Sequence, residues 1–240
     1  MSFLAKIFGE NSKPITFKKA KNQLDDLICI HFSGLGYKFI EKDTTSITLL
    51  KKDGFGELEI YIVYLSKYES IEIEVYFYQY INIIEKHLRL IYGEKKDKTR
   101  ILSFQILDLI NNRDGIAKKM GNMYIVENEE DVVTISKRIF NDFKFVEILS
   151  DKVNDIIFLD TLLNCSYNKY LNIVYNLSFL DRTIVGLIVA AMDNNPDIYK
   201  YYQLYNSEAI KKKVEYEDVF NDFNLGVAYI NKLAGGKLNA

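Results

Sequence analysis

The residue types that most often perform chemistry in proteins are sparse in this chain of 240 residues. It has two histidines, His31 and His87, and two cysteines, Cys29 and Cys165. Cys29 and His31 are two positions apart, and on a helix this spacing directs the two side chains well away from each other. Neither histidine has another His, Cys or carboxylate at the spacing of metal ligands. We therefore expect structural histidines, no catalytic residue and no metal site.

Sequence motifs for nucleophiles and phosphates are missing as well. The chain has no GxSxG, no GxxxxGK[ST] and no GxGxxG. Gly34-Leu35-Gly36 follows a predicted helix, whereas a phosphate-binding loop follows a strand. The two cysteines are too few for a disulfide framework and indicate thiols in a reducing cytosol. We predict no cofactor.

The pattern with the most functional content is an alternation of glutamate and tyrosine within residues 56–80. The segment reads GELEIYIVYLSKYESIEIEVYFYQY, and its period of two predicts two strands that each bury one apolar face. The residues on the opposite side of both strands form what we call the Glu/Tyr face: Glu57, Glu59, Tyr61, Glu72, Glu74, Tyr76 and Tyr78.

The Glu/Tyr face is the candidate partner-binding surface. Tyrosine offers rigid, amphipathic contact area at low entropic cost, and carboxylates attract a basic partner. Two alternatives need no partner: an ordinary solvated sheet face, or a face that the C-terminal helices cover. Four glutamates also suggest a divalent cation, but a flat strand face has no loop to enclose one.

Two predicted turns set the strands that carry this face. A four-residue turn at Ser66–Glu69 places Leu58 opposite Phe77 and Tyr61 opposite Glu74. Asp53-Gly54 predicts a second hairpin, which joins this pair to a strand at 46–52. A further strand at 37–41 and a helix at 15–33 complete the arrangement, with the helix across the apolar face of the sheet. In this helix Leu24, Leu27 and Ile28 form the apolar face, and Asp25 is expected on the solvated flank.

The pattern changes after the central hairpin and becomes helical after residue 127. Residues 81–91 predict a short helix, and 101–110 fit either a strand or a helix, with the strand preferred. Residues 111–121 predict a loop, and 123–126 predict a short strand. Asn128 is a predicted helix N-cap. The helices expected after it span 129–147, 149–163, 170–179, 182–193, 196–213 and 216–234.

These elements predict an α+β fold in which an N-terminal helix lies on an antiparallel β-meander and an all-helical C-terminal half follows. We expect a sheet subdomain at 1–127 and a helical subdomain at 128–240, unless the two form one continuous domain. With 48% hydrophobic residues the chain can bury a sizeable core. Nucleic-acid binders usually carry an excess of basic residues, whereas this chain has a net charge of -2. No apolar run is long enough for a membrane span, so we expect a soluble, cytoplasmic bacterial protein.

The opening of the chain resembles small bacterial cytosolic proteins, some of which accompany secreted toxins as immunity proteins. The resemblance lies in an amphipathic helix followed by GLGYKFI (34–40), SITLLKK (46–52) and ELEIYIVYL (57–65). It implies a non-enzymatic protein that binds one toxin domain, with the Glu/Tyr face as the contact.

Two other functions stay open. A small-molecule-binding module or an unfamiliar enzyme would have a pocket between sheet and helices, marked by His31, Cys29 or a buried carboxylate with a perturbed pKa. A homo-oligomer would use the aromatic segment 196–205 as its interface.

Overall fold

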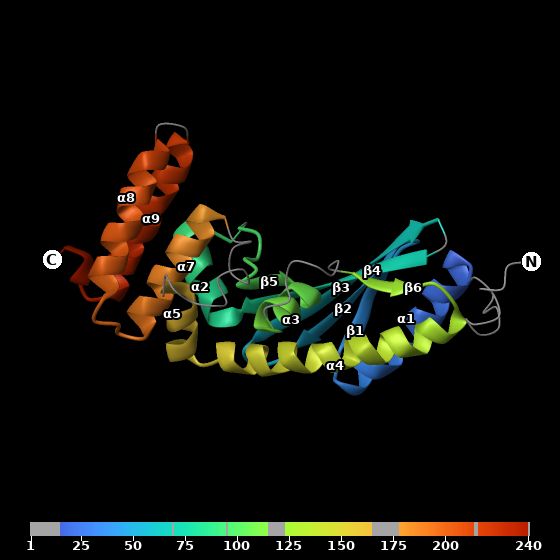
Figure 1. The fold of residues 1–240 in the computed structure, drawn as a ribbon. Helices are drawn as coiled ribbons and strands as arrows, with labels where there is room; N and C mark the ends of the chain where they lie inside the picture. The colour runs from blue at the N-terminus through green and yellow to red at the C-terminus, as the bar shows by residue number, and fades with distance from the viewer. Residues whose placement is uncertain are drawn as a thin grey trace, which may run out of the picture. The chain divides into compact units, whose positions relative to one another are not determined.

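The computed structural model describes residues 15–68, 70–94, 96–114, 123–164, 178–213 and 216–239. Within them, six strands form one sheet in the order β1-β2-β3-β4-β5, and β6 pairs with β4 elsewhere along its length. The strands are β1 (Lys38–Lys42), β2 (Ser46–Lys52), β3 (Gly56–Lys67), β4 (Ser70–Ile81), β5 (Leu102–Gln105) and β6 (Tyr124–Val126). The helices are α1 (Phe17–Gly34), α2 (Asn82–Tyr92), α3 (Ile106–Asp114), α4 (Glu129–Val153), α5 (Ile156–Asn164), α7 (Phe179–Met192), α8 (Ile198–Lys213) and α9 (Glu217–Leu233). Figure 1 shows their arrangement along the chain.

This order confirms the predicted fold class, an N-terminal helix with an antiparallel meander and then helices. The ambiguous segment 101–110 holds both elements, because β5 ends at Gln105 and α3 begins at Ile106. Asn128 caps α4 as predicted: its side chain accepts from the backbone N–H groups of Glu130 and Asp131. Most of the helix predicted at 170–179 and most of the loop predicted at 111–121 lie outside the described residues. The described part of that loop, 111–114, was predicted wrongly, because it belongs to α3.

The sequence predicts correctly which residues of β3 and β4 share a face, but it predicts the wrong register between the two strands. The apolar positions of both strands are buried and the alternate ones half-buried, as expected. However, Asn82 N donates to Phe55 O at 2.8 Å, and the rings of Tyr61 and Tyr76 lie 6.3 Å apart. Both observations place Tyr61 opposite Tyr76 instead of Glu74. The strand β3 runs to Lys67 and β4 begins at Ser70, so two residues separate the strands where the sequence predicted four. A two-residue slip keeps every side chain on its face, so the alternation alone does not reveal it.

Gly56 fixes how closely the start of β3 lies against the end of β4. A Cβ at this position would stand 1.8 Å from the carbonyl oxygen of Tyr80, so no larger residue fits without moving backbone.

The chain divides into two compact units that interleave in sequence. Unit 1 comprises residues 1–51, 60–76 and 105–145, and unit 2 comprises 52–59, 77–104 and 146–240. The strands β3 and β4 and the helix α4 each contribute residues to both. The subdomain boundary expected at residue 127 stays a prediction.

The core of unit 1 lies between α1, the first part of α4 and the sheet. Phe32 of α1 packs edge-on against Phe143 of α4 with ring centroids 4.8 Å apart, and Tyr37 contacts both rings. Leu24 and Ile28 of α1 are also fully buried. Thr16 caps α1 by accepting from Lys19 N. The buried stripe on α1 therefore holds the helix on the apolar face of the sheet, as the sequence predicts.

Unit 2 is built around α7, whose residues from Thr183 to Ala191 are all buried. It packs against α2, α5, α8 and α9. Such a helix, apolar on all sides, is typical of a central position in a helical bundle. Gly186 allows the approach of α5, because a Cβ there would lie 2.7 Å from the side-chain oxygen of Asn164.

Candidate functional site

All seven residues of the Glu/Tyr face are half-buried, so this face of the sheet is neither fully exposed nor fully covered by other parts of the chain. The face runs along β3 and β4 and therefore has residues in both units. Its two parts have different partners and are described in turn.

In unit 2, the glutamates of the face are paired with cations of the chain itself. Glu57 Oε1 accepts from Lys98 Nζ at 2.6 Å and from Lys52 Nζ at 3.0 Å. Burial raises the pKa of Glu57, but the hydrogen bonds from Lys98 and Lys52 outweigh burial, so its pKa lies below the usual value. Glu57 is thus a satisfied carboxylate and offers little charge to a partner.

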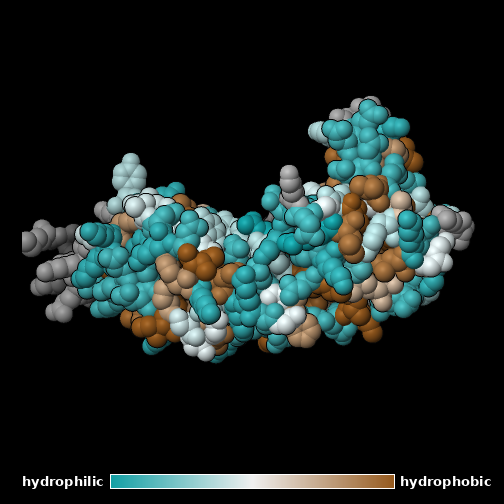
Figure 2. Space-filling view, turned by 180° about the vertical axis from the view of Figure 1, so that it is seen from behind, coloured by the Kyte–Doolittle hydropathy of each residue, from teal (hydrophilic) through white to brown (hydrophobic). Residues whose placement is uncertain are grey.

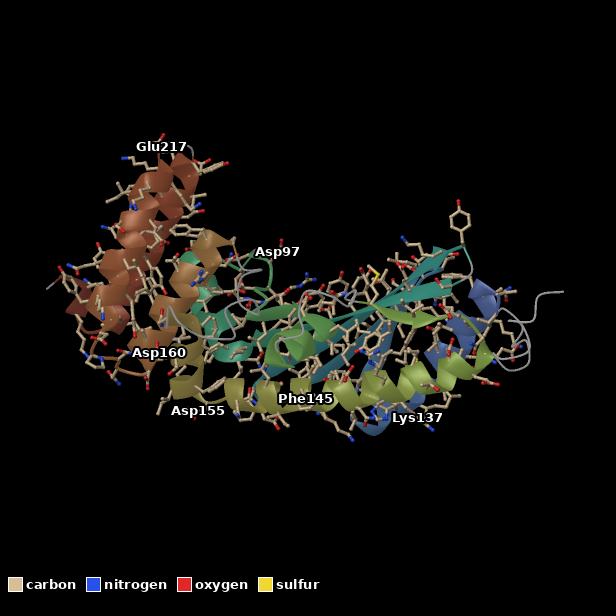
Figure 3. The ribbon with its side chains drawn as sticks, in the orientation of Figure 1. Asp97, Lys137, Phe145, Asp155, Asp160 and Glu217 are labelled. Carbon is tan, nitrogen blue, oxygen red and sulfur yellow. The ribbon has the colours of Figure 1, made fainter. Side chains whose placement is uncertain are left out.

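Arg100 covers the next part of the face in unit 2. Its guanidinium lies 3.9 Å from the ring centroid of Tyr78, and its Nε donates to Tyr80 Oη at 3.1 Å. It also lies 4.0 Å from a carboxylate oxygen of Glu59, which accepts from Tyr80 Oη at 3.2 Å. Lys98 and Arg100 belong to the segment that connects α2 to β5, where Figure 3 labels their neighbour Asp97. Among the described residues, the cations that reach this part of the face come from this segment and from Lys52.

In unit 1, the face keeps its aromatic and acidic character. The half-buried rings of Tyr61 and Tyr76 face each other across β3 and β4, tilted by 33°. Tyr76 Oη donates to Glu74 at 2.8 Å. Glu72 has a cation, Lys67, at 3.7 Å, but the lysine side chain is 57% exposed and the pair is therefore weak.

An apolar residue that the sequence analysis missed extends this part of the face. Ile125 of β6 lies directly opposite Glu72 of β4 and is 48% exposed. Opposite residues of an antiparallel pair share one face, so Ile125 stands beside the glutamates. The strand at 123–126 was predicted, but its pairing with β4 is a long-range contact that local sequence does not encode. We call Tyr61, Glu72, Glu74, Tyr76 and Ile125 the tyrosine patch.

The two histidines have structural partners. His31 is half-buried and stacks on Phe140 of α4 with ring centroids 3.8 Å apart. His87 Nδ1 lies 2.8 Å from Tyr229 Oη of α9, and burial, helped by Lys86, lowers its pKa. Burial raises the pKa of Cys29, which makes its thiol a poorer nucleophile.

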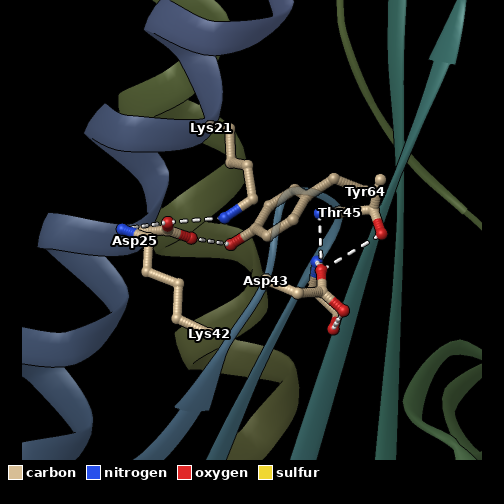
Figure 4. A network of polar contacts seen from close by, with 7 residues as sticks. Lys21, Asp25, Lys42, Asp43, Thr45 and Tyr64 are labelled. Atoms are coloured by element: carbon tan, nitrogen blue, oxygen red, sulfur yellow. Dashed lines mark hydrogen bonds and ion pairs between the residues drawn. The ribbon is translucent and has the colours of Figure 1, made fainter.

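Asp25 is the residue whose environment the sequence analysis described wrongly. It was placed on the flank of the first helix, but it is only 1% exposed. Its carboxylate accepts from Lys21 Nζ and Lys42 Nζ, both at 2.8 Å, and from Tyr64 Oη at 2.7 Å (Figure 4). The signal was present, because positions 21, 24, 25, 28 and 32 share the buried face of α1. These contacts give Asp25 a complete structural role in unit 1.

A second buried carboxylate, Asp160 of α5, lies in unit 2 and has amide partners (Figure 3). It accepts from Asn164 Nδ2 at 2.6 Å and from Asn195 Nδ2. Asn164 also donates to Gly186 O and accepts from Tyr205 Oη. Burial raises the pKa of Asp160, and the two amide hydrogen bonds oppose this shift. The network joins α5, α7 and α8 and explains why Tyr205, one tyrosine of the aromatic segment, is buried.

Unit 2 also contains a cavity of about 530 Å³ between the strand ends and α2. It is lined by Glu57, Tyr80, Asn82, Glu85, Lys86, Arg89, Leu90, Glu94 and Lys98. Glu85 is a buried carboxylate, which is the mark expected of a ligand pocket. Burial raises its pKa, against the N–H of Thr99 and the cations Arg89, Lys96 and Lys98.

Outside these sites, exposed large apolar residues are distributed over both units, and they include Phe39, Ile40, Phe55, Ile157 and Leu204. Figure 2 shows hydrophobic residues in patches separated by hydrophilic ones on the face that it displays. Among the described residues, no three His, Cys, Asp or Glu side chains converge as metal ligands. No helix in the described ranges is long and apolar enough to cross a bilayer.

Comparison with known proteins gives no relative from which a role could be transferred. No family model matches the chain, and neither the curated proteins nor the solved structures contain a match. The candidate sites therefore stand on their own geometry.

Proposed function

We propose that this chain is a non-enzymatic binding module for another protein and that the tyrosine patch of unit 1 is its contact surface. The observation that carries the proposal is the pair of half-buried tyrosine rings, 6.3 Å apart, with carboxylates on the same face. This narrows the contact from the whole Glu/Tyr face to the part where, among the described residues, the exposed Lys67 is the one cation paired with a glutamate.

The patch has the composition of a protein contact surface. Tyrosines are enriched in binding hot spots because a ring buries a large area and fixes few torsions. The hydrogen bond from Tyr76 to Glu74 holds ring and carboxylate in one geometry before a partner arrives. Ile125 adds apolar area beside Glu72. Glu72 and Glu74 supply the negative potential that speeds the approach of a basic surface.

The partner that fits this surface is a protein with a basic, partly apolar patch. The most specific function that we propose is neutralisation of a toxin domain in the bacterial cytosol. The resemblance to immunity proteins implies this function. A toxin inhibitor needs only to bind tightly, so this function agrees with the structural roles found for both histidines.

The test is affinity capture from the native bacterial lysate with the full chain as bait. We expect a partner that wild type retains and that Tyr61→Ala/Tyr76→Ala loses. Removing a hot-spot ring costs about 2 kcal/mol or more in binding free energy, so the double variant should weaken binding at least about thirtyfold. The toxin form adds a growth assay, in which co-expression of wild type, and not of the double variant, restores growth to cells that produce the partner.

The matched control is Tyr68→Ala in the turn between β3 and β4. Tyr68 is fully exposed and outside the patch, so its removal should leave capture unchanged. Thermal unfolding shows whether each variant stays folded. A folded Tyr61→Ala/Tyr76→Ala protein that captures its partner as well as wild type would refute the proposed surface.

A further inference from the structure

The cavity of unit 2 is lined by three parts of the chain. The strand ends contribute Glu57 and Tyr80, α2 contributes one row of polar side chains, and the segment after α2 contributes Glu94 and Lys98. Its volume of about 530 Å³ falls within the range of small-molecule sites, roughly 300 to 1,000 Å³. All of its lining residues belong to unit 2, so its geometry depends on that unit alone.

The carboxylates around the cavity already have hydrogen-bond donors. Glu57 accepts from two lysines, at 2.6 and 3.0 Å. Glu85 accepts from the backbone N–H of Thr99 at 2.7 Å. Glu94 has Arg89 Nη1 at 3.4 Å, but its side chain is 85% exposed, so water competes for this contact. These carboxylates already have donors, so they do not need a bound cation.

Two cationic side chains on α2 have unused hydrogen-bond donors. Lys86 is exposed and has no ion-pair partner in the described part of the chain. Among the described residues, the guanidinium of Arg89 makes one hydrogen bond, from Nη1 to the exposed Glu94 at 3.4 Å. A guanidinium has five N–H donors, so Arg89 keeps donors on Nη1 and Nη2 for a ligand in the cavity that it lines.

We propose that this cavity binds a small ligand that carries a phosphate or carboxylate group, held by the guanidinium of Arg89 and the ammonium of Lys86. Arginine presents parallel N–H donors that match the two oxygens of either group. Leu90 and the ring of Tyr80 provide apolar wall for the remainder of the ligand. The volume of the cavity limits the ligand to a small molecule.

This inference concerns a different surface from the tyrosine patch and does not depend on it. The tyrosine patch offers carboxylates to a basic protein, whereas the cavity offers cations to a small anion. The two proposals therefore succeed or fail separately.

The test is a heteronuclear NMR titration of the full chain with inorganic phosphate, with succinate and with neutral succinamide. We expect saturable shifts of α2 resonances with at least one anion, at dissociation constants in the millimolar range or below, and none with succinamide. Saturation by phosphate alone, or by succinate alone, identifies which group the site prefers. No saturable shift with either anion up to about 10 mM would overturn the proposal, since this limit is well above millimolar affinity.

Variants locate the binding within the cavity. Arg89→Gln removes the guanidinium and should weaken binding about tenfold or more, as expected for loss of a charge-assisted hydrogen bond. Arg89→Lys keeps the charge but loses the paired N–H donors of the guanidinium, so its affinity should lie between those of wild type and Arg89→Gln. Lys86→Gln should weaken binding as well, and Lys211→Gln, an exposed lysine of α8, is the matched control. Equal binding by wild type, Arg89→Gln and Lys86→Gln would show that the anion does not use this cavity.

Discussion

The two units handle their charges in opposite ways. Unit 1 buries Asp25 and Lys21 in its interior, with the exposed Lys42 as a second cation on Asp25, and it leaves glutamates on its sheet face. Unit 2 satisfies the glutamates of the same strands with Lys52, Lys98 and Arg100, and leaves cationic donors on α2. Strand alternation places a side chain on a face, but neighbouring segments decide whether that face retains a charge.

The largest effect should come from breaking the buried charge cluster of unit 1. Asp25→Ala leaves Lys21, which is 4% exposed, without its anion. Breaking a buried ion pair in this way destabilises a protein by about 3–5 kcal/mol in free energy of unfolding. Urea unfolding of Asp25→Ala measures this loss. The neighbouring exposed residue provides the control, because Asp26→Ala should change stability by no more than about 0.5 kcal/mol. Equal losses in both variants would mean that the cluster has no special role.

A smaller loss should follow from uncovering the unit 2 part of the Glu/Tyr face. Arg100→Ala removes the contact with the Tyr78 ring and the hydrogen bond to Tyr80. Because the arginine side chain is 48% exposed, we expect a loss of only about 1 kcal/mol in unfolding free energy. Chemical denaturation provides the value. A change within error would show that Arg100 merely lies over the face without stabilising it.

The cavity of unit 2 should give a pH-dependent contribution to stability. Burial raises the folded-state pKa of Glu85, so the folded protein binds this proton more tightly than the unfolded chain does. Stability from this group is therefore present at low pH and decreases as pH rises from the unfolded value toward and through the raised folded pKa. Glu85→Gln should remove that decrease, and unfolding of both proteins between pH 4 and pH 7, with each pair compared at the same pH, measures it. A constant difference between the two proteins over this range would contradict the assignment.

The smallest effect should be found at the exposed ion pair of the tyrosine patch. Lys67→Ala removes a partner 3.7 Å from Glu72, and such exposed pairs contribute less than about 1 kcal/mol. We expect stability to stay within about 0.5 kcal/mol of wild type while partner capture stays the same or improves. Weaker capture would place Lys67 itself in the contact.

Much of the fold follows from local pattern, and the parts that do not are long-range. The alternation in 56–80 predicts both faces correctly, since Leu58, Ile60, Ile62 and Tyr64 of β3 and Ile71, Ile73, Val75 and Phe77 of β4 are all buried. Register was missed because a two-residue slip preserves that alternation. Asp25 was misplaced because a carboxylate was assumed to be solvated, although it shares a helical face with Leu24, Ile28 and Phe32.

The candidate sites were less predictable than the fold. Lys98 and Arg100 reach Glu57 and Glu59 from about forty residues away in sequence, and no local rule encodes that contact. The same holds for Ile125 beside Glu72. The cavity contains Glu85, Lys86 and Arg89 of one predicted helix, but their convergence with Glu57 and Lys98 appears only once the chain is folded.

Two charge reversals of the same size decide whether the contact surface lies in unit 1 or in unit 2. Both Glu72→Lys/Glu74→Lys and Glu57→Lys/Glu59→Lys change two glutamates on the same strand face, and circular dichroism and thermal unfolding confirm that each protein is folded. Affinity capture then compares the partner retained by each variant with the partner retained by wild type. We predict that Glu72→Lys/Glu74→Lys loses the partner and that Glu57→Lys/Glu59→Lys keeps it. Loss by the second variant alone, or retention by both, would contradict the account.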